Sequence, residues 1–119
     1  MDLQFTQEEL DFQKEVRDWI KGNYPKDMKK RYMHSPNGHL TREEHMQWQQ
    51  ALHSKGWSGI NWPKKYGGQE KPGIYDYILN EELCRVGAPS PGKSVGSIGQ
   101  TIIHHGSKKI KDEFLEKVT

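Results

Sequence analysis

The chain has 119 residues, a length suited to one domain, and a net charge of +2 with both signs interspersed. This balance argues against a dedicated nucleic-acid binder, which would gather its basic residues into a patch or stripe. Apolar residues together with glycine make up about 38% of the chain, below the about 45–50% of ordinary domains. A low share of apolar residues is typical of a domain that packs against a neighbouring domain, and it is equally typical of a polar helical domain.

The only cysteine, Cys84, excludes an internal disulfide and a cysteine-based zinc site. No apolar run is long enough to span a membrane, and residues 1–5 lack the basic and apolar regions of a signal peptide. We therefore expect no membrane span and a cytoplasmic location. The basic run at residues 108–111 is followed at once by Asp112 and Glu113, which indicates a solvated helix face.

The first third of the chain predicts two helices and a turn. Thr6 and Glu9 have the spacing of a capping box, and apolar residues then recur at helical spacing until Gly22 and Pro25 end the helix. Residues 25–33 predict a short polar helix. The turn-forming residues from 34 to 39 close this part of the chain.

A second capping box, Thr41 with Glu44, predicts another helix, and Gly56 is placed to end it in the left-handed conformation. Residues 57–73 contain too many glycines and prolines for a regular helix. Their aromatic residues indicate an ordered loop packed on the domain.

The last third of the chain predicts three more helices. The clearest amphipathic pattern begins at Tyr75 and ends at Val86. A further helix is expected over residues 92–105, with Val95, Ile98, Ile102 and Ile103 on one face, and a last one after Gly106-Ser107. With no convincing strand, the fold class is all-α, a bundle of five or six helices.

The residues show no legible active site. Adjacent His104 and His105 diverge on a helix, and His45 and His53 lack further ligands at metal-binding spacing, so we expect no metal site. Glu82 falls on the apolar face of its helix. A buried carboxylate can be a catalytic base, but pairing with Arg85 or capping of a neighbouring backbone is the favoured interpretation.

Gly96 and Gly99 lie inside the helix expected over residues 92–105. An interior glycine costs about 1 kcal/mol relative to alanine, so a compensating role is expected. Either another part of the chain passes close to the helix, or the missing side chains leave room for a ligand.

Four stretches of the sequence, in order, resemble motifs of the acyl-CoA dehydrogenase family. The first fits the family's opening helix, the second a Trp- and Gly-rich loop, the third a helix end and the fourth a glycine-led helix. They are Phe5 to Leu10, Gly56-Trp57 with Trp62-Pro63-Lys64-Lys65-Tyr66-Gly67-Gly68, Glu81 to Pro89, and Gly99 to Ser107 with Phe114-Leu115. The sequence departs from the family at Gln100, where proline is frequent, and at Lys109-Ile110, a surface change.

The resemblance implies that residues 1–119 form the N-terminal helical domain, without the middle β-barrel and C-terminal helical domains. Family members bind FAD and oxidise acyl-CoA to 2-enoyl-CoA in lipid metabolism, with a carboxylate base in the C-terminal domain in most branches. Most flavin contacts also come from the absent domains. No residue here is therefore assigned a catalytic role, and the chain alone is expected to retain no FAD and to be inactive.

The resemblance also places this domain along one wall of the acyl pocket. The matching substrate-binding residues are Val95, Ile98, Gly99 and Ile102, with Tyr75 and Leu79 behind them. It favours space for an acyl group over helix packing at the two glycines, and it implies an oligomeric parent enzyme. The alternative is a free-standing helical interaction module derived from the same fold.

Overall fold

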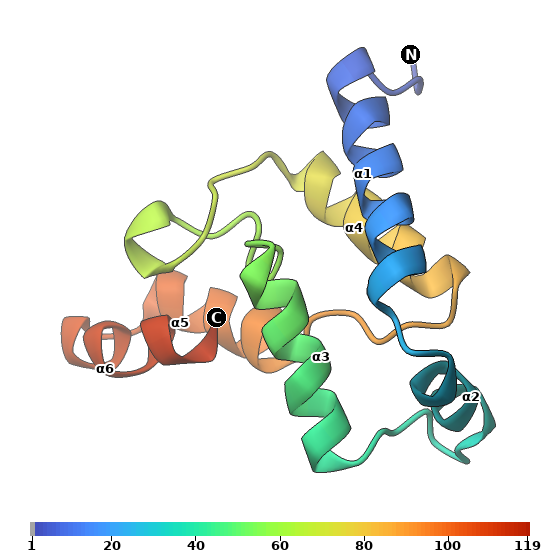
Figure 1. The fold of residues 1–119 in the computed structure, drawn as a ribbon. Helices are drawn as coiled ribbons and strands as arrows, with labels where there is room; N and C mark the ends of the chain where they lie inside the picture. The colour runs from blue at the N-terminus through green and yellow to red at the C-terminus, as the bar shows by residue number, and fades with distance from the viewer. Residues whose placement is uncertain (1) are drawn as a thin grey trace.

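The chain folds into six α-helices in a computed structural model, which describes residues 2–119 (Figure 1). No strand occurs in this range, so the predicted all-α class is confirmed. The connection after α3 contains a 3-10 turn, η1 (Lys64–Tyr66), and a π-helical turn, η2 (Ser94–Ile98), leads directly into α5. The helices are α1 (Gln7–Asn23), α2 (Lys26–His34), α3 (Arg42–Ser54), α4 (Gly73–Arg85), α5 (Gly99–His105) and α6 (Lys108–Val118).

Both predicted capping boxes are confirmed. The Thr6 hydroxyl accepts a hydrogen bond from the Glu9 amide at the start of α1, and Thr41 accepts one from Glu44 at the start of α3. In each box the glutamate also accepts a bond from the amide of the capping threonine. Gly56 follows α3 at φ +72°, the left-handed conformation expected of a glycine that ends a helix.

The main core lies among the first four helices. Val16 and Ile20 of α1 pack with Leu79 and Leu83 of α4, and α1 crosses in front of α4 in Figure 1. Trp48 of α3 is buried in the same cluster. Its indole nitrogen donates to the Pro89 carbonyl oxygen at 2.8 Å, so the segment after α4 is tied to α3.

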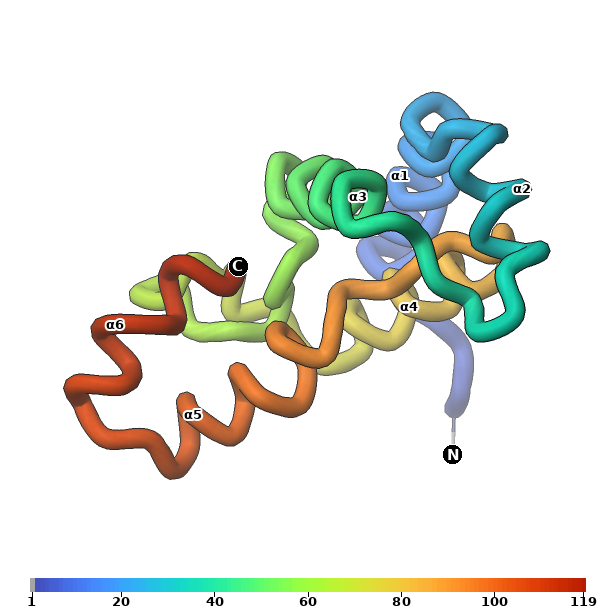
Figure 2. Tube along the Cα trace, turned by 90° about the horizontal axis from the view of Figure 1, so that it is seen from below, coloured from blue at the N-terminus to red at the C-terminus, as the bar shows by residue number. Residues whose placement is uncertain are grey.

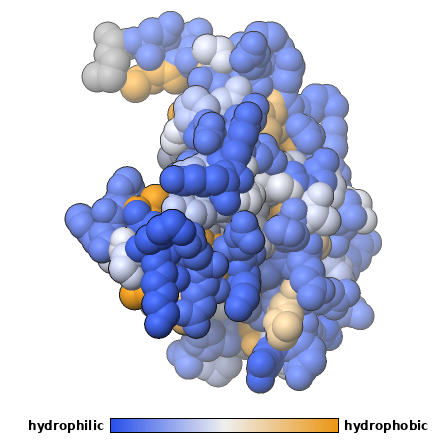
Figure 3. Space-filling model, turned by 90° about the vertical axis from the view of Figure 1, so that its left-hand side faces the viewer, coloured by the Kyte–Doolittle hydropathy of each residue, from blue (hydrophilic) through white to orange (hydrophobic). Residues whose placement is uncertain are grey.

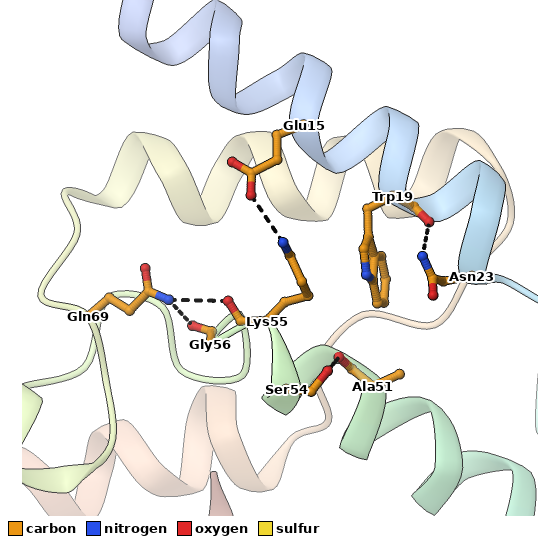
Figure 4. Close-up of polar contacts among 8 residues, drawn as sticks. All are labelled: Glu15, Trp19, Asn23, Ala51, Ser54, Lys55, Gly56 and Gln69. Atoms are coloured by element: carbon orange, nitrogen blue, oxygen red, sulfur yellow. Dashed lines mark hydrogen bonds and ion pairs between the residues drawn. The ribbon is translucent and has the colours of Figure 1, made fainter.

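The segment between α3 and α4 is an ordered loop, as predicted. Trp57, Ile60 and Trp62 are each at most 3% exposed, so the loop supplies core side chains and is no linker. Figure 4 shows how it is fastened: the Gln69 side-chain amide donates to the Gly56 carbonyl oxygen at 2.9 Å. In the same view Lys55, just after α3, reaches Glu15 of α1 at 3.3 Å.

A second, smaller core lies beneath α5 and α6. It joins Trp62 of the loop, Val95 of η2 and Leu115 of α6, with Ile102, Ile103 and other partly buried residues packed around them. Figures 1 and 2 show α5 and α6 extending to one side, away from α1 and α2. The Cα radius of gyration is 15.1 Å, larger than the about 13.5 Å typical of a compact domain of this length.

The surface agrees with the polar composition. Figure 3 shows one face on which hydrophilic residues dominate and hydrophobic patches are small and separated. In the range the structure describes, no helix is long and apolar enough to cross a membrane.

Candidate functional site

The helical segment from Ser94 to His105 contains a change of helix type. Its first five residues form η2, in which the Ile98 amide donates to the Lys93 carbonyl five residues earlier at 3.0 Å. From Gly99 onward the segment is α-helical. Single π turns within helices occur frequently at functional sites. The helical segment starts at Ser94, two residues later than the expected start at residue 92, and it is not one regular α-helix.

The wide turn moves Ile98 off the buried face. On a continuous α-helix Val95, Ile98 and Ile102 would share one side. In the structure Val95 is 6% exposed and Ile102 is partly buried, whereas Ile98 is 57% exposed. The expectation that Ile98 packs on the same face as Val95 is therefore wrong, because the i to i+5 hydrogen bonds of the π turn rotate the following residues. Ile98 presents its side chain outward.

The two glycines of this segment have different surroundings. A Cβ atom built on Gly99 would collide with the indole of Trp62 and lie 2.8 Å from the Ser94 carbonyl oxygen. At Gly99 the missing side chain thus makes room for Trp62, the close-packing alternative. A Cβ atom on Gly96 would meet nothing within 4 Å, so Gly96 borders open space.

Two separate cavities both have Val95 among their lining residues. One, of about 270 Å³, lies between α3 and the end of the chain and is lined by residues such as His45, Gln49 and Val118. The other, of about 190 Å³, lies toward α4 and is lined by Gly96, Gln100 and polar residues of α4 and the preceding loop. Tyr75 and Leu79 belong to the main core instead, away from the cluster that contains Val95.

Glu82 is held as an anion. Its side chain is 1% exposed. Arg17 of α1 donates two hydrogen bonds to the carboxylate, from Nη2 at 2.8 Å and from Nε at 3.0 Å. Arg85 lies 3.6 Å away, the pairing that the sequence favoured. Hydrogen bonding from Arg17 holds the pKa of Glu82 below its ordinary value despite burial. A carboxylate so stabilised ties α1 to α4 and is a poor proton acceptor.

Metal ligands do not assemble in the part of the chain that the structure describes. No group of three or more His, Cys, Asp or Glu side chains is placed to hold an ion. His104 and His105 project with ring centroids 6.4 Å apart, as adjacent helical residues do.

The fold and the position of this segment can now be compared with known proteins. A sequence model of a protein family matches residues 6–119, and this family is described as "Acyl-CoA dehydrogenase, N-terminal domain". The chain belongs to this family. The all-helical architecture agrees with an acyl-CoA dehydrogenase N-terminal domain, and the four sequence motifs that suggested it all lie within or at the edge of the matched range.

Similar proteins include bacterial acyl-CoA dehydrogenases. Acyl-CoA dehydrogenase IpdE1 of Mycolicibacterium smegmatis is 29% identical over 112 residues, which are 91% of this chain and 29% of that protein. Acyl-CoA dehydrogenase FadE26 of Mycobacterium tuberculosis is 35% identical over 63 residues, which are 53% of this chain and 16% of that protein. The chain therefore spans less than a third of the length of these acyl-CoA dehydrogenases.

Solved structures show the same fold. The Tcur3481-Tcur3483 steroid ACAD superposes with a TM-score of 0.84 and 30% identity, over 99% of this chain and 30% of the other. The ChsE4-ChsE5 complex from Mycobacterium tuberculosis superposes with a TM-score of 0.81 over 99% of this chain and 29% of the other. Its identity is 24%, so this second likeness concerns the fold alone.

Acyl-CoA dehydrogenases generally use FAD, whose pyrophosphate requires cationic or backbone amide partners. Neither cavity at Val95 is lined by a Lys or Arg side chain that would face a pyrophosphate.

Sequence reasoning missed four residues that shape the candidate site or hold Glu82. Trp62, which fills the space at Gly99, was assigned only to the loop, and Arg17, the main partner of Glu82, was not singled out. Asp76 and Asn80, which line the cavity beside Gly96, were also passed over. Their spacing of four residues on α4 was the available signal, because it places both on one side of the helix.

Proposed function

We propose that residues 1–119 are the N-terminal domain of a longer FAD-dependent acyl-CoA dehydrogenase that oxidises acyl-CoA to 2-enoyl-CoA. In this proposal the middle β-barrel and C-terminal helical domains supply the base and most flavin contacts. The family match over residues 6–119 carries the proposal, together with the small share of the relatives' length that the chain spans. A cytoplasmic location and an oligomeric enzyme belong to the same proposal, the latter supported by the Tcur3481-Tcur3483 steroid ACAD, whose name joins two proteins.

The acyl wall is the segment from Ser94 to His105. Ile98 gives it an exposed apolar side chain, and Gly96 borders open space. Val95, Gly99 and Ile102 support the wall from behind through the second core, where Trp62 packs against Gly99. The site residues therefore divide into one that contacts the acyl group, Ile98, and three that hold the segment in place.

The isolated chain provides the first test. The 119-residue protein is expected to fold as helices, to lose added FAD on gel filtration and to leave acyl-CoA unoxidised. Stoichiometric retention of FAD by this chain would contradict the proposal. Reading the frame beyond Thr119 separates the two candidate functions, since a continuing β-rich segment supports the enzyme and a native stop codon supports a free-standing interaction module.

The wall itself is tested by substitution in the enzyme that contains the domain. Ile98→Phe enlarges an exposed wall residue, so kcat/KM for the longest accepted acyl-CoA should fall about tenfold relative to a short one. Ile110→Phe is the matched control, because Ile110 is a 40% exposed isoleucine on α6. Equal effects of the two variants on every chain length would refute the assignment of Ile98.

A further inference from the structure

The cavity between α4 and the η2–α5 segment is lined by four polar side chains. Asp76 and Asn80 of α4 line it from one side, and Gly96 and Gln100 line it from the other. Each pair is four residues apart, so both members lie on the same face of their helix. Asn61 of the loop completes the polar lining, and Trp62, Val95 and Pro91 supply apolar surface.

The polar groups at this cavity keep hydrogen-bonding capacity. Gln100 Nε2 donates to Asn61 Oδ1 at 3.3 Å, which links the helix to the loop. This bond does not use the side-chain oxygen of Gln100 or the side-chain amide hydrogens of Asn61. The Asn80 amide donates to the backbone oxygen of Asp76 at 2.8 Å. An amide side chain offers both donors and acceptors, so one bond does not exhaust it.

Asp76 is the charged group of the cavity. Burial raises the pKa of its carboxyl above the ordinary value, and a hydrogen bond with Asn80 opposes this in part, with no cation contributing. A half-buried carboxylate without a cationic partner gains from a ligand that donates a hydrogen bond to it. An aspartate in the first turn of a helix also interacts favourably with the helix dipole, but this role requires no cavity in front of it.

The space is large enough for part of a substrate. Its volume of about 190 Å³ is many times what one water molecule requires, and Gly96 keeps it open because a side chain there would extend into free space. Gln100 adds a side-chain amide to the lining.

We propose that Asp76, Asn80, Gln100 and Asn61 form a polar subsite that binds an alcohol hydroxyl carried by the acyl group of the substrate. The Asp76 carboxylate accepts the hydroxyl hydrogen, and an amide hydrogen of the cavity bonds to the hydroxyl oxygen. The hydrocarbon next to the hydroxyl lies against Pro91, which supplies apolar surface to the cavity. This inference rests on the proposed acyl-CoA dehydrogenase function, and it makes the substrate an acyl-CoA with a hydroxylated chain or ring instead of a plain fatty acyl-CoA.

The kinetic test uses the enzyme that contains this domain and two acyl-CoA substrates with the same carbon skeleton, one with and one without a hydroxyl. The wild type should prefer the hydroxylated substrate. Asp76→Leu should lower that preference about tenfold, the usual scale for losing a hydrogen bond to a charged acceptor, and Asp76→Asn should restore part of it. Asp27→Leu is the matched control, since Asp27 lies in the first turn of α2.

A second measurement is independent of catalysis. Cyclohexanol titrated into the 15N-labelled 119-residue chain should shift the side-chain amide signals of Asn61, Asn80 and Gln100 saturably. Cyclohexane should not, and Asp76→Leu should abolish the shifts while the rest of the spectrum confirms the fold.

The outcomes separate the two proposals. If the enzyme oxidises both acyl-CoA substrates and Asp76→Leu lowers kcat/KM equally for both, or if cyclohexanol shifts none of the three amides, the subsite is refuted and the dehydrogenase function stands. If no acyl-CoA is oxidised, the proposed function fails, and the cyclohexanol titration still decides whether the cavity binds an alcohol.

Discussion

Replacing Gly99 by alanine should destabilise the domain, although alanine is the better helix former. Gly99 has helical backbone angles, φ −60° and ψ −46°, so alanine introduces no backbone strain. The added methyl group would collide with the Trp62 indole and approach the Ser94 carbonyl oxygen. Trp62 is only 1% exposed in the second core, so a shift of its ring would disturb the packing there.

The magnitude follows from two opposing contributions. Overpacking of a close-packed core costs about 1–3 kcal/mol, and alanine returns up to about 1 kcal/mol of helix propensity. The difference lies between about 0 and 3 kcal/mol, and its middle, about 1–2 kcal/mol, is the expected net loss. For a chain of this length, 1 kcal/mol corresponds to about 4 °C in Tm, so the expected decrease is about 4–8 °C.

Thermal unfolding of the 119-residue chain, followed by circular dichroism, measures this effect. Gly96→Ala is the matched control in the same segment, because its methyl group would enter open space. It should leave Tm unchanged or raise it by a few degrees. If Gly99→Ala is as stable as Gly96→Ala, Trp62 does not depend on the missing side chain, and the reasoning about this position is wrong.

Two further predictions concern the contact between Glu82 and Arg17 and the cap at the start of α3. The stabilisation that Glu82 gives through its lowered pKa is complete above the ordinary value of 4.5 and is lost as pH falls through the folded-state value. The Tm of the wild type should therefore fall more steeply below about pH 4.5 than that of Glu82→Gln, and parallel curves would show that the contact with Arg17 contributes nothing. Thr41→Ala removes the cap of α3 and should cost about 1 kcal/mol in urea unfolding, whereas an unchanged midpoint would contradict the capping role.

Local features of the fold could be predicted from the sequence because their causes are close together in the chain. The boxes opened by Thr6 and Thr41 each need only four residues, and Gly56 ends α3 through its own conformation. The order and type of the helices follow from such signals and from apolar spacing.

Long-range contacts could not be predicted in this way. The partner of Glu82 is Arg17, 65 residues earlier, and periodicity within one helix indicates only neighbours such as Arg85. The role of Gly99 likewise depends on Trp62, which arrives from a loop without regular structure.

The π turn is the reason that the candidate site was predicted only in part. Helical periodicity assumes a constant turn, so it placed Ile98 on the same face as Val95. The wider turn separates them, and the exposure of Ile98 could be recognised only from the structure.

The central claim is that the segment from Ser94 to His105 lines the acyl pocket. An acyl-CoA carrying a photoactivatable diazirine on its acyl chain tests this most directly when it is irradiated on the enzyme that contains this domain. Peptide mass spectrometry should locate adducts within residues 94–102, with Ile98 the main position, and excess unlabelled acyl-CoA should prevent them. Competed adducts that fall only outside residues 94–102 would contradict the account.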